Sequence, residues 1–565
     1  LLYSRLFSDS VLQKSGAQLT IAGFVVAFAV ARFILDRRIV FPRVPVFTPF
    51  ICFVVWGLVS TVPSMNPMLG LETLLVYVAP FCLFVAVNQH CRTAAAVSRL
   101  LWVVMFTSIV VSTIGVLQYF GVEVLKVPDL HRDLPVSTLG NTNLVAYYQD
   151  LILPLLAAIL LSQWRRLAQW QRFLVGLGLA LASFQVIVAG SRAGWLSAGV
   201  GVVVLLILTT RGGAWFRRAP LVVLATLLLL PIGQMLLQST SVGSRETLYD
   251  LAAQIGGEAW DRALTAFDTQ DFSRSSRILM WTDTVDLVQD VPVLGVGPGQ
   301  YWMALAPYID REAWNELMRK RGLDLPHEPR HAHNEFLEFA AEVGLVGLAI
   351  LIWLYAALLK TGFRYLGPRC VVASGGGPDR KGLARPLRAT TAGIVSGVIA
   401  TLVHAGTAFN LHHPVVSGHL WLLAGAMVAL HSRRLSAGDR VIEVSLDAVV
   451  RPAVCGGVGL VLAFLLTSAG GRLLVGEYYY QAGQKSLSAG NHVSAVASLG
   501  RAVSWRGHEF RYHRLLGRIA LGRGRPAEAR AALERGLQLH PNDAGALRLL
   551  GGILVRSGSP RAIEI

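Results

Sequence analysis

The chain has 565 residues and a formal net charge of +17, and 53% of its residues are hydrophobic while only 15% are charged. Since ordinary soluble domains carry roughly 25% charged residues, a soluble enzyme of this length is excluded, as are disordered, collagen-like and small disulfide-rich proteins. What remains is a polytopic membrane protein, and its five scattered cysteines show no metal-binding spacing.

Apolar stretches long enough to cross a bilayer, which takes about 20 residues, recur about twelve times along the chain. We expect spans at residues 17–35, 47–63, 69–87, 98–120, 143–162, 171–190, 194–210, 219–237, 336–359, 389–409, 414–431 and 452–471. The sequence therefore predicts an all-α fold with about 12 transmembrane helices in residues 1–471. This membrane domain includes a long loop at residues 238–335, and a soluble domain follows at residues 472–565.

The basic residues are distributed unevenly between the two sets of connecting loops. One set holds 22 Arg and Lys residues, whereas the short loops of the other set hold three. Because cytoplasmic loops carry the excess of basic residues, this contrast fixes the orientation and explains the net charge without a nucleic-acid partner. The loop at residues 238–335 and the C-terminal domain then face away from the cytoplasm. The first residue falls on the same side, so we expect a further helix before it.

Small residues recur with a period of 34 residues after the last span, which is typical of tetratricopeptide repeats built from pairs of helices. The recurring positions are Gly483, Gly517 and Gly551; Gly490, Gly524 and Gly558; Ala495 and Ala529; and Leu499 and Leu533. Residues 472–565 thus resemble a tetratricopeptide-repeat domain of two full units and a started third. Because such arrays need about three repeats, we expect this one to be truncated. Repeats of this kind bind partners and carry no chemistry.

Arg192 lies in a tight turn between two apolar spans, on the side where the orientation rule disfavours a cation. One interpretation is a helix-end arginine that snorkels to lipid headgroups. The other is a fixed cation for a phosphate at the membrane surface, since a guanidinium binds phosphate oxygens in a bidentate fork. The sequence leaves both open.

Arg277 and Trp281 stand four residues apart, on one face of a predicted helix. Residues 290–301 follow with the sequence Asp-Val-Pro-Val-Leu-Gly-Val-Gly-Pro-Gly-Gln-Tyr. The three glycines invite comparison with a phosphate-binding loop, but no strand is expected before them and no Lys-Ser/Thr follows. We therefore predict a turn that ends an amphipathic helix.

A polar group directly precedes the span at residues 336–359, and it contains Arg330, His331, His333, Asn334 and Glu335. Two neighbouring histidines could indicate zinc, but no HExxH or spaced His/Asp/Glu set accompanies them, and we predict no metal. One histidine acting as a general base at the membrane boundary suits the pKa of the imidazole, which lies near ambient pH. A histidine that caps a helix or contacts headgroups is the alternative.

Taken in order, these motifs form a recognisable set. They are Gly140-Asn141-Thr142-Asn143, Ser191-Arg192-Ala193-Gly194-Trp195, Arg277-x-x-x-Trp281, Gly295-Val-Gly297-Pro298-Gly299, His333-Asn334-Glu335-Phe336-Leu337 and Glu342-x-Gly344-Leu345-x-Gly347. The set resembles the O-antigen ligase/polymerase superfamily of bacterial glycan-assembly membrane enzymes, from about residue 45 to about residue 430. Members with appended tetratricopeptide repeats are familiar. Thr142 stands where the family more often has Pro, which affects the turn rather than the chemistry.

The resemblance implies transfer of a glycan from a polyprenyl diphosphate carrier to an acceptor hydroxyl, on the periplasmic face of the bacterial inner membrane. It assigns His333 as the general base and Arg192 and Arg277 as the arginines that stabilise the diphosphate leaving group. Neither a metal nor another cofactor is required, because the diphosphate is already an activated leaving group. We expect the substrate to contact a further group of residues, namely Arg330, His331, Asn334, Trp281 and Glu335.

The acceptor stays open at this point. It is the lipid A core in a ligase, a second lipid-linked glycan in a polymerase, and a Ser or Thr hydroxyl in a protein O-oligosaccharyltransferase. A transporter is less consistent with the sequence, because internal inverted repeats and broken mid-membrane helices are not evident in it. A non-catalytic scaffold built around the repeats is the remaining alternative, with a protein partner bound to those repeats.

Overall fold

The computed structural model is almost entirely helical. It describes residues 10–36, 38–42, 44–91, 93–119, 122, 136–209, 272–320, 329–367, 378–432, 441–445 and 450–558. The strands within these ranges are β1 (Arg38–Pro42) and β2 (Val441–Ser445), which pair antiparallel with Arg38 opposite Ser445.

Ten helices in the described part of the chain are long and apolar enough to cross a membrane. They are α1 (Ser10–Asp36), α3 (Pro67–His90), α4 (Ala94–Tyr119), α5 (Thr142–Gln163), α6 (Gln169–Val188), α7 (Arg192–Thr209), α13 (Glu335–Leu366), α15 (Pro378–Ala405), α16 (Pro414–Ser432) and α17 (Val450–Ser488). The predicted all-α membrane fold is thus confirmed. Of the two other predicted spans, α2 (Phe47–Thr61) has 15 residues, and residues 219–237 lie outside the described residues.

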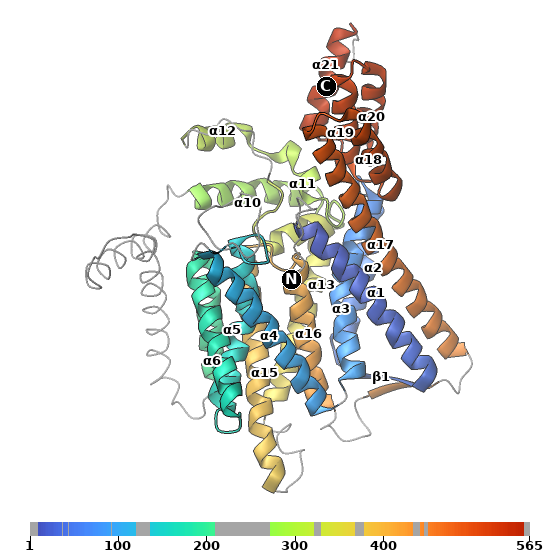
Figure 1. The fold of residues 1–565 in the computed structure, drawn as a ribbon. Coiled ribbons are helices and arrows are strands. Elements are labelled where there is room, and N and C mark those ends of the chain that lie inside the picture. Colours follow the sequence, from blue (N-terminus) through green and yellow to red (C-terminus); the bar gives the residue numbers. More distant parts are fainter. Residues whose placement is uncertain are drawn as a thin grey trace, which may run out of the picture.

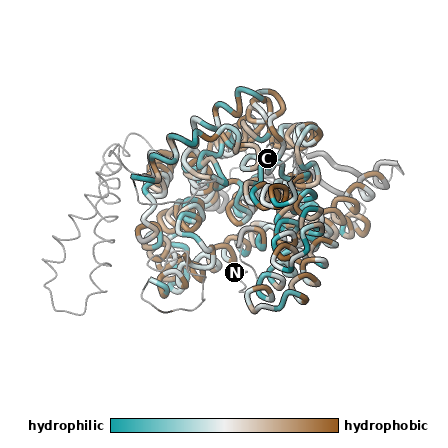
Figure 2. Tube along the Cα trace, turned by 90° about the horizontal axis from the view of Figure 1, so that it is seen from above, coloured by the Kyte–Doolittle hydropathy of each residue, from teal (hydrophilic) through white to brown (hydrophobic). Residues whose placement is uncertain are grey.

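The helices stand side by side, and their connections alternate between the two ends of the bundle (Figure 1). We call the end that carries residues 272–320 and the repeats the upper end. The most deeply buried of these helices is α5, whose first seventeen residues are mostly buried and which packs against α6, α7 and α15. Seen along the bundle, hydrophobic residues occur on most of the helices (Figure 2). Several large apolar side chains point outward, as expected of a lipid-facing surface: Phe24, Leu35, Phe106, Leu161, Phe173 and Phe464.

Short helices from the long loop lie over the upper end of the bundle (Figure 1). They are α10 (Phe272–Asp290), α11 (Tyr301–Ala304), a 3-10 turn η2 (Ala306–Tyr308) and α12 (Arg311–Lys320). The amphipathic α12 packs Trp314 and Met318 against Met280 of α10. The indole of Trp314 also donates a 2.9 Å hydrogen bond to Asp283. Residues 272–320 therefore form a folded cap rather than an extended linker.

The C-terminal repeats continue directly from the last membrane helix. The predicted domain boundary at residues 471/472 falls inside α17, which runs to Ser488 and is followed by α18 (His492–Trp505), α19 (Phe510–Gly522), α20 (Pro526–Leu539) and α21 (Ala544–Arg556). A Cβ added to Gly483 would lie 2.9 Å from Leu499 Cγ, and one added to Gly517 would lie 2.6 Å from Leu533 Cγ. The 34-residue glycine period thus marks close helix crossings.

A buried ion pair joins the repeats to the membrane helices. Arg506, which is 2% exposed, donates hydrogen bonds to both carboxylate oxygens of Glu72 on α3 at 2.8–3.1 Å. His508 approaches the same carboxylate at 2.9 Å, and Asn542 donates to the carbonyl oxygen of Met303 in the cap. The repeats are therefore docked on the upper end at two points.

We expect Glu72→Gln to loosen this docking. The variant leaves Arg506 with only its second ion pair, to Glu509 at 2.6 Å. Loss of one partner of a buried ion pair costs as much as about 3–5 kcal/mol. Hydrogen–deuterium exchange of α18–α21 in nanodiscs should therefore rise in this variant. Glu316→Gln, which removes an exposed ion pair with Lys320, is the control. Equal protection in both variants would show that the pair does not hold the repeats.

The second docking point should respond to acid through His540. This ring packs against Trp302 and Phe510 at centroid distances of 4.9 and 4.8 Å, and burial lowers its pKa to about 4. Since the pKa of an unfolded histidine is about 6.5, the contribution of the neutral ring to stability is complete above that pH. It is lost as the pH falls from about 6.5 to about 4. Exchange at α20 and α21 should rise over this window, and less so in His540→Phe; an unchanged pH response in that variant would contradict the assignment.

Candidate functional site

A break in α13 shapes the upper end of the bundle. Gly344 has φ 71° and ψ 175°, and a Cβ there would lie 1.9 Å from the carbonyl oxygen of Val293. Only glycine accommodates this approach. The N–H groups of Val296 and Gly297 donate to the carbonyl oxygens of Ala341 and Glu342, at 2.9 and 2.8 Å. The glycine-rich turn therefore binds the broken helix with its backbone rather than a phosphate, consistent with the predicted turn.

Three glutamates line one face of the first two turns of α13. Glu335, Glu338 and Glu342 follow spacings of three and four residues, which places them on one side of a helix. Their exposures are 0%, 1% and 2%. Three buried carboxylates at the membrane boundary are costly unless each is paired.

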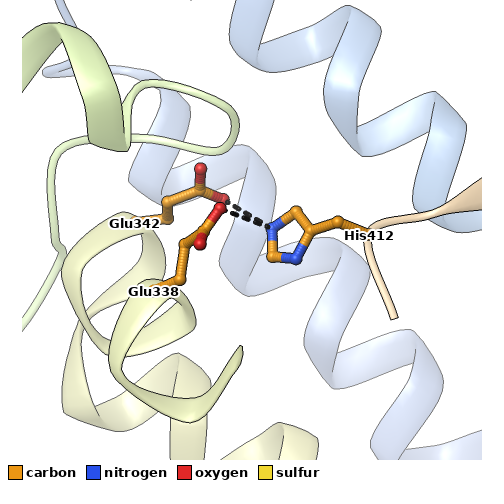
Figure 3. Close-up of side chains that lie close together, drawn as sticks. All are labelled: Glu338, Glu342 and His412. Carbon is orange, nitrogen blue, oxygen red and sulfur yellow. Dashed lines mark ion pairs between the residues drawn. The ribbon is translucent and has the colours of Figure 1, made fainter. Parts of the chain in front are cut away.

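Each of these glutamates has a partner outside α13, and two of the three partners come from distant parts of the chain. His412 Nδ1 lies 2.6 Å from Glu335, His331 Nδ1 lies 2.7 Å from Glu338, and Tyr77 donates a 3.2 Å hydrogen bond to Glu342. His412 Nε2 also points toward Glu338 and Glu342, at 3.8 and 3.5 Å (Figure 3). The cluster thus ties α13 to α3 and to the turn before α16.

His412 supplies positive charge to this cluster. Burial alone would lower its pKa, but the carboxylates of Glu335 and Glu338 outweigh burial and hold the pKa of His412 well above its ordinary value. A protonated His412 therefore neutralises part of the buried negative charge. Glu338, Glu342 and His412 also offer oxygen and nitrogen atoms within 4.8 Å of one another. Such a donor set can hold a divalent cation in principle, although the same carboxylates already accept the hydrogen bonds described above.

The loop at residues 331–333 is held from both sides. Glu338 accepts a hydrogen bond from the backbone N–H of Ala332, and the Trp281 indole donates to the Ala332 carbonyl oxygen, both at 2.9 Å. Phe409 stacks on the His331 ring at 4.0 Å and meets the edge of the His333 ring at 5.2 Å. The two histidines therefore share one aromatic neighbour.

His333 has an unusual backbone conformation. Its φ of 49° lies in the left-handed region, which few residues other than glycine adopt and which costs of order 1–3 kcal/mol. Asn334 then caps α13 by accepting hydrogen bonds from the N–H groups of Phe336 and Leu337. The fixed cap and the Trp281 bond hold His333 in this conformation at the top of the helix. Strain of this kind is often found at functional sites.

Arg277 approaches the same region from the cap. It lies on α10, four residues before Trp281, and is within electrostatic reach of the Tyr147 hydroxyl of α5, as is Glu335. Phe409 packs against Tyr147 at 6.2 Å. Tyr147 and Phe409 thus link the arginine to the histidine loop. Arg277 and His333 are more than fifty residues apart, so their motifs alone do not establish this link.

Arg192 is the first residue of α7, at the same end of the bundle. Ser191 caps the helix by accepting from the Gly194 N–H at 3.3 Å. A Cβ on Gly194 would lie 2.8 Å from the Cβ of Ala146, so the glycine allows α7 to pack closely against α5. The Trp195 indole donates to the Val186 carbonyl oxygen. This turn therefore fixes an arginine at a helix N-terminus, where the helix dipole also favours an anion.

A second buried polar group lies beneath Tyr147. His404 Nδ1 approaches Asp150 at 2.6 Å, and Ser197 donates to the same carboxylate at 2.8 Å. The His404 ring also meets the Tyr147 ring edge-on at 4.5 Å. The group connects α5, α7 and α15 and supports Tyr147 from below. Sequence analysis did not identify it.

The structure refines the roles expected for the predicted substrate-contacting residues. Arg330 is exposed beside the histidine loop. Asn334 and Trp281 hold that loop, and Glu335 is fully buried against His412. His412, Phe409 and Tyr77 were not singled out as site residues. The spacing of the glutamates on α13 was the one available signal that buried partners had to exist.

Two segments of the chain match known protein families. Residues 177–352, which contain Arg192, Arg277 and His333, match the O-antigen ligase family, and residues 510–553 match the tetratricopeptide-repeat family. The exopolysaccharide production protein ExoQ of Rhizobium meliloti (strain 1021) is 27% identical over 192 residues, which are 32% of this chain and 41% of that protein. The chain thus aligns with less than half the length of this relative. The predicted resemblance is confirmed: this multi-pass membrane protein is similar to the O-antigen ligase family over residues 177–352 and to tetratricopeptide repeats over residues 510–553.

Proposed function

We propose that the protein transfers a glycan from a polyprenyl diphosphate carrier to an acceptor hydroxyl at the upper end of the bundle. The observation that carries this proposal is the placement of His333 on a rigid loop at the membrane boundary, linked to Arg277 through Phe409 and Tyr147, within the segment that matches the O-antigen ligase family. Both residues lie next to the Tyr147–Phe409 pair. A general base and a cation for a diphosphate are the groups that this reaction needs.

In the proposed reaction, His333 accepts the proton of the acceptor hydroxyl while its oxygen attacks the anomeric carbon. The bond from that carbon to the diphosphate oxygen breaks, and the electron pair leaves with the diphosphate, with inversion at the carbon. Arg277 and Arg192 stabilise the charge that develops on the leaving group. Glu338 holds His331, and Glu335 holds His412; we assign both glutamates to positioning these rings rather than to substrate contact.

The upper end faces the periplasm in this proposal, and the membrane is the bacterial inner membrane. The loops rich in Arg and Lys join the helices at the lower end, and the excess of basic residues marks the cytoplasmic side. The histidine loop, the cap and the repeats then lie on the periplasmic side, where the proposed transfer takes place.

Reconstitution tests this function directly. Liposomes with the purified protein, a polyprenyl-diphosphate glycan and one candidate acceptor at a time should yield a transfer product with a lipid A core, a second lipid-linked glycan or a protein. Folded protein that transfers to none of these acceptors would contradict the proposal. In cells, deletion should accumulate lipid-linked polymer for a ligase and single repeat units for a polymerase. The exopolysaccharide production relative favours the polymerase among these alternatives.

We expect the reaction to be independent of divalent metal. The oxygens of Glu338 and Glu342 already accept hydrogen bonds from His331, Ala332 and Tyr77, and the diphosphate needs no further activation. Transfer in the reconstituted system should therefore be unchanged after exhaustive treatment with EDTA. Loss of activity that added Mg²⁺ or Mn²⁺ restores would instead assign the cluster of Glu338, Glu342 and His412 to a cation.

A further inference from the structure

A groove lies between α1 and α4 on the side of the bundle away from α7. Its cavity of about 230 Å³ is lined mainly by apolar side chains, among them Ala17, Ile21, Leu83, Val111 and Leu422. Figure 1 shows α16 between and behind these two helices. Because α1 packs on α3 and α17 while α4 packs on α6, the two helices flank an opening that faces the lipid.

The upper part of this groove is polar. Lys14, which is 6% exposed, donates a 2.7 Å hydrogen bond to the carbonyl oxygen of Leu139. The amide oxygen and nitrogen of Gln18 and the hydroxyl of Thr138 are buried without a hydrogen-bond partner among the described residues, and the hydroxyl of Tyr148 lies near that of Ser108. Lys14, Gln18, Thr138 and Tyr148 all line the groove. Buried polar atoms without partners cost about 1–3 kcal/mol each, so their convergence points to a polar ligand group.

The groove and Arg192 lie on opposite sides of α5. Ala146 packs against the start of α7, whereas Tyr148, two residues further along, lines the groove. Since successive helix residues are about 100° apart, these two side chains point in nearly opposite directions. A ligand in the groove therefore approaches the site from the side opposite to Arg192.

The turn before α16 divides the two sides in the same way. His412 contacts the glutamates of α13, while its neighbour His413 lies within electrostatic reach of Lys14. The two sides of this turn meet at the upper end, so a headgroup beside Lys14 would lie across the turn from the histidine loop. The groove thus has its own access from the membrane and shares the polar end of the bundle with the candidate site.

We propose that this groove binds a second lipid phosphate, with one hydrocarbon chain along the groove and the phosphate beside Lys14 and the polar atoms of Gln18 and Thr138. This lipid is the carrier of the acceptor glycan, an identification that rests on the proposed glycan transfer. The donor diphosphate binds at the arginines on the other side of α5, and the two substrates enter the reaction from separate directions.

The chemistry of the groove selects this occupant among the three acceptors. A protein acceptor needs no apolar groove open to the bilayer. A lipid A core carries several acyl chains, whereas this narrow cavity suits one chain. A buried lysine together with unpartnered donors complements a phosphate, and a polyprenyl phosphate supplies both the single chain and the charge.

Binding of undecaprenyl phosphate to the purified full-length protein tests the site without any transfer reaction. Native mass spectrometry would measure its dissociation constant in the wild type and in two matched pairs of variants. Ile21→Trp places an indole in the groove from a residue that is 52% exposed. Phe24→Trp, its control, places the same indole on α1 at a residue that is 64% exposed and outside the groove. Lys14→Met removes the charge, and Lys360→Met does so at the lower end of α13.

We expect Ile21→Trp to abolish this binding and Lys14→Met to weaken it about fivefold, the factor that corresponds to about 1 kcal/mol for a lysine near an anionic headgroup. Both control variants should bind as the wild type does. Equal binding by Ile21→Trp and Phe24→Trp would overturn the proposal, as would equally strong displacement by the two-chain lipid phosphatidylglycerol. Because Ile21 is exposed, its variant remains informative if Lys14→Met fails to fold.

Kinetics separate this inference from the proposed function. In a reconstituted polymerisation, Ile21→Trp should raise the KM for the acceptor lipid and leave the KM for the donor unchanged. Transfer with unchanged acceptor KM would refute the groove while leaving glycan transfer intact. Groove binding in a protein that transfers no glycan would do the reverse, since the lipid site would stand and the reaction would not.

Discussion

Replacing His333 with alanine should lower the rate of glycan transfer by about 10²–10⁴-fold, the usual contribution of a positioned general base. The histidine lies on a loop that Glu338 and Trp281 hold through the backbone of Ala332. Its removal therefore deletes the base without loosening these bonds. Alanine carries a Cβ as histidine does, so the left-handed backbone is not relieved in the variant, and the melting temperature should stay near that of the wild type. Transfer measured in liposomes, together with circular dichroism, checks both expectations.

The neighbouring His331 provides the sharpest comparison for this variant. Its Nδ1 is paired with Glu338, an arrangement that also orients catalytic histidines. If His333 is the base, the acidic limb of the kcat/KM–pH profile should disappear in His333→Ala and persist in His331→Ala. The reverse result would transfer the role of base to the His331–Glu338 pair. A transfer rate equal to that of the wild type in both variants would exclude base catalysis by either histidine of this loop.

The architecture could be predicted from the sequence because it follows from periodic signals. A membrane span needs only a long apolar stretch, and ten of the predicted spans correspond to apolar helices. The repeats follow from a glycine period, because Gly483 and Gly517 occupy equivalent crossings against Leu499 and Leu533. What these signals do not predict is the length of a helix beyond its span. Thus α17 continues from the membrane into the repeats although composition changes near residue 471.

The candidate site could be predicted only as a set of separate motifs. Arg192, Arg277 and His333 were identified by motif, but their surroundings depend on contacts between residues far apart in the chain. Glu335 and its partner His412 are 77 residues apart, and Tyr77 and Glu342 are 265 apart. No local pattern encodes such pairings. The glutamate spacing on α13 predicts a shared face and a need for partners, while the identity of those partners requires the fold.

The glycine motifs illustrate how a pattern can be recognised before its physical role is known. Gly295, Gly297 and Gly299 all have positive φ, which a phosphate-binding loop would also require. The N–H groups of Val296 and Gly297 instead donate to the carbonyl oxygens of Ala341 and Glu342, just before the break at Gly344, while that of Gly295 donates to Val291. The two motifs are therefore one device. It turns α13 so that its first two turns carry the glutamate face toward the histidines.

Substituting lysine for Arg277 should lower kcat by about 10²-fold, even though the charge is kept. Removing one preorganised donor from a developing anion costs roughly this factor, and lysine lacks the planar fork that contacts two phosphate oxygens. Arg192→Lys should show a similar loss if α7 presents the same fork to the diphosphate, and normal activity there would favour a snorkelling arginine. Arg319→Lys on the exposed face of α12 is the matched control.

The two arginines can also be distinguished from each other by the contacts that hold them in place. Both are assigned to the donor, so either lysine variant should change kcat and the donor KM while leaving the acceptor KM unaltered. Arg277 lies beside Tyr147 together with Glu335, whereas Arg192 depends on the Ser191 cap and the Gly194 packing. Ser191→Ala should therefore reduce activity through Arg192 alone. It should lower the transfer rate when introduced into the wild type but lower it little further when introduced into Arg192→Lys. Additive losses would instead mean that the turn supports the fold and not the diphosphate contact, because independent sites contribute additively whereas coupled ones do not.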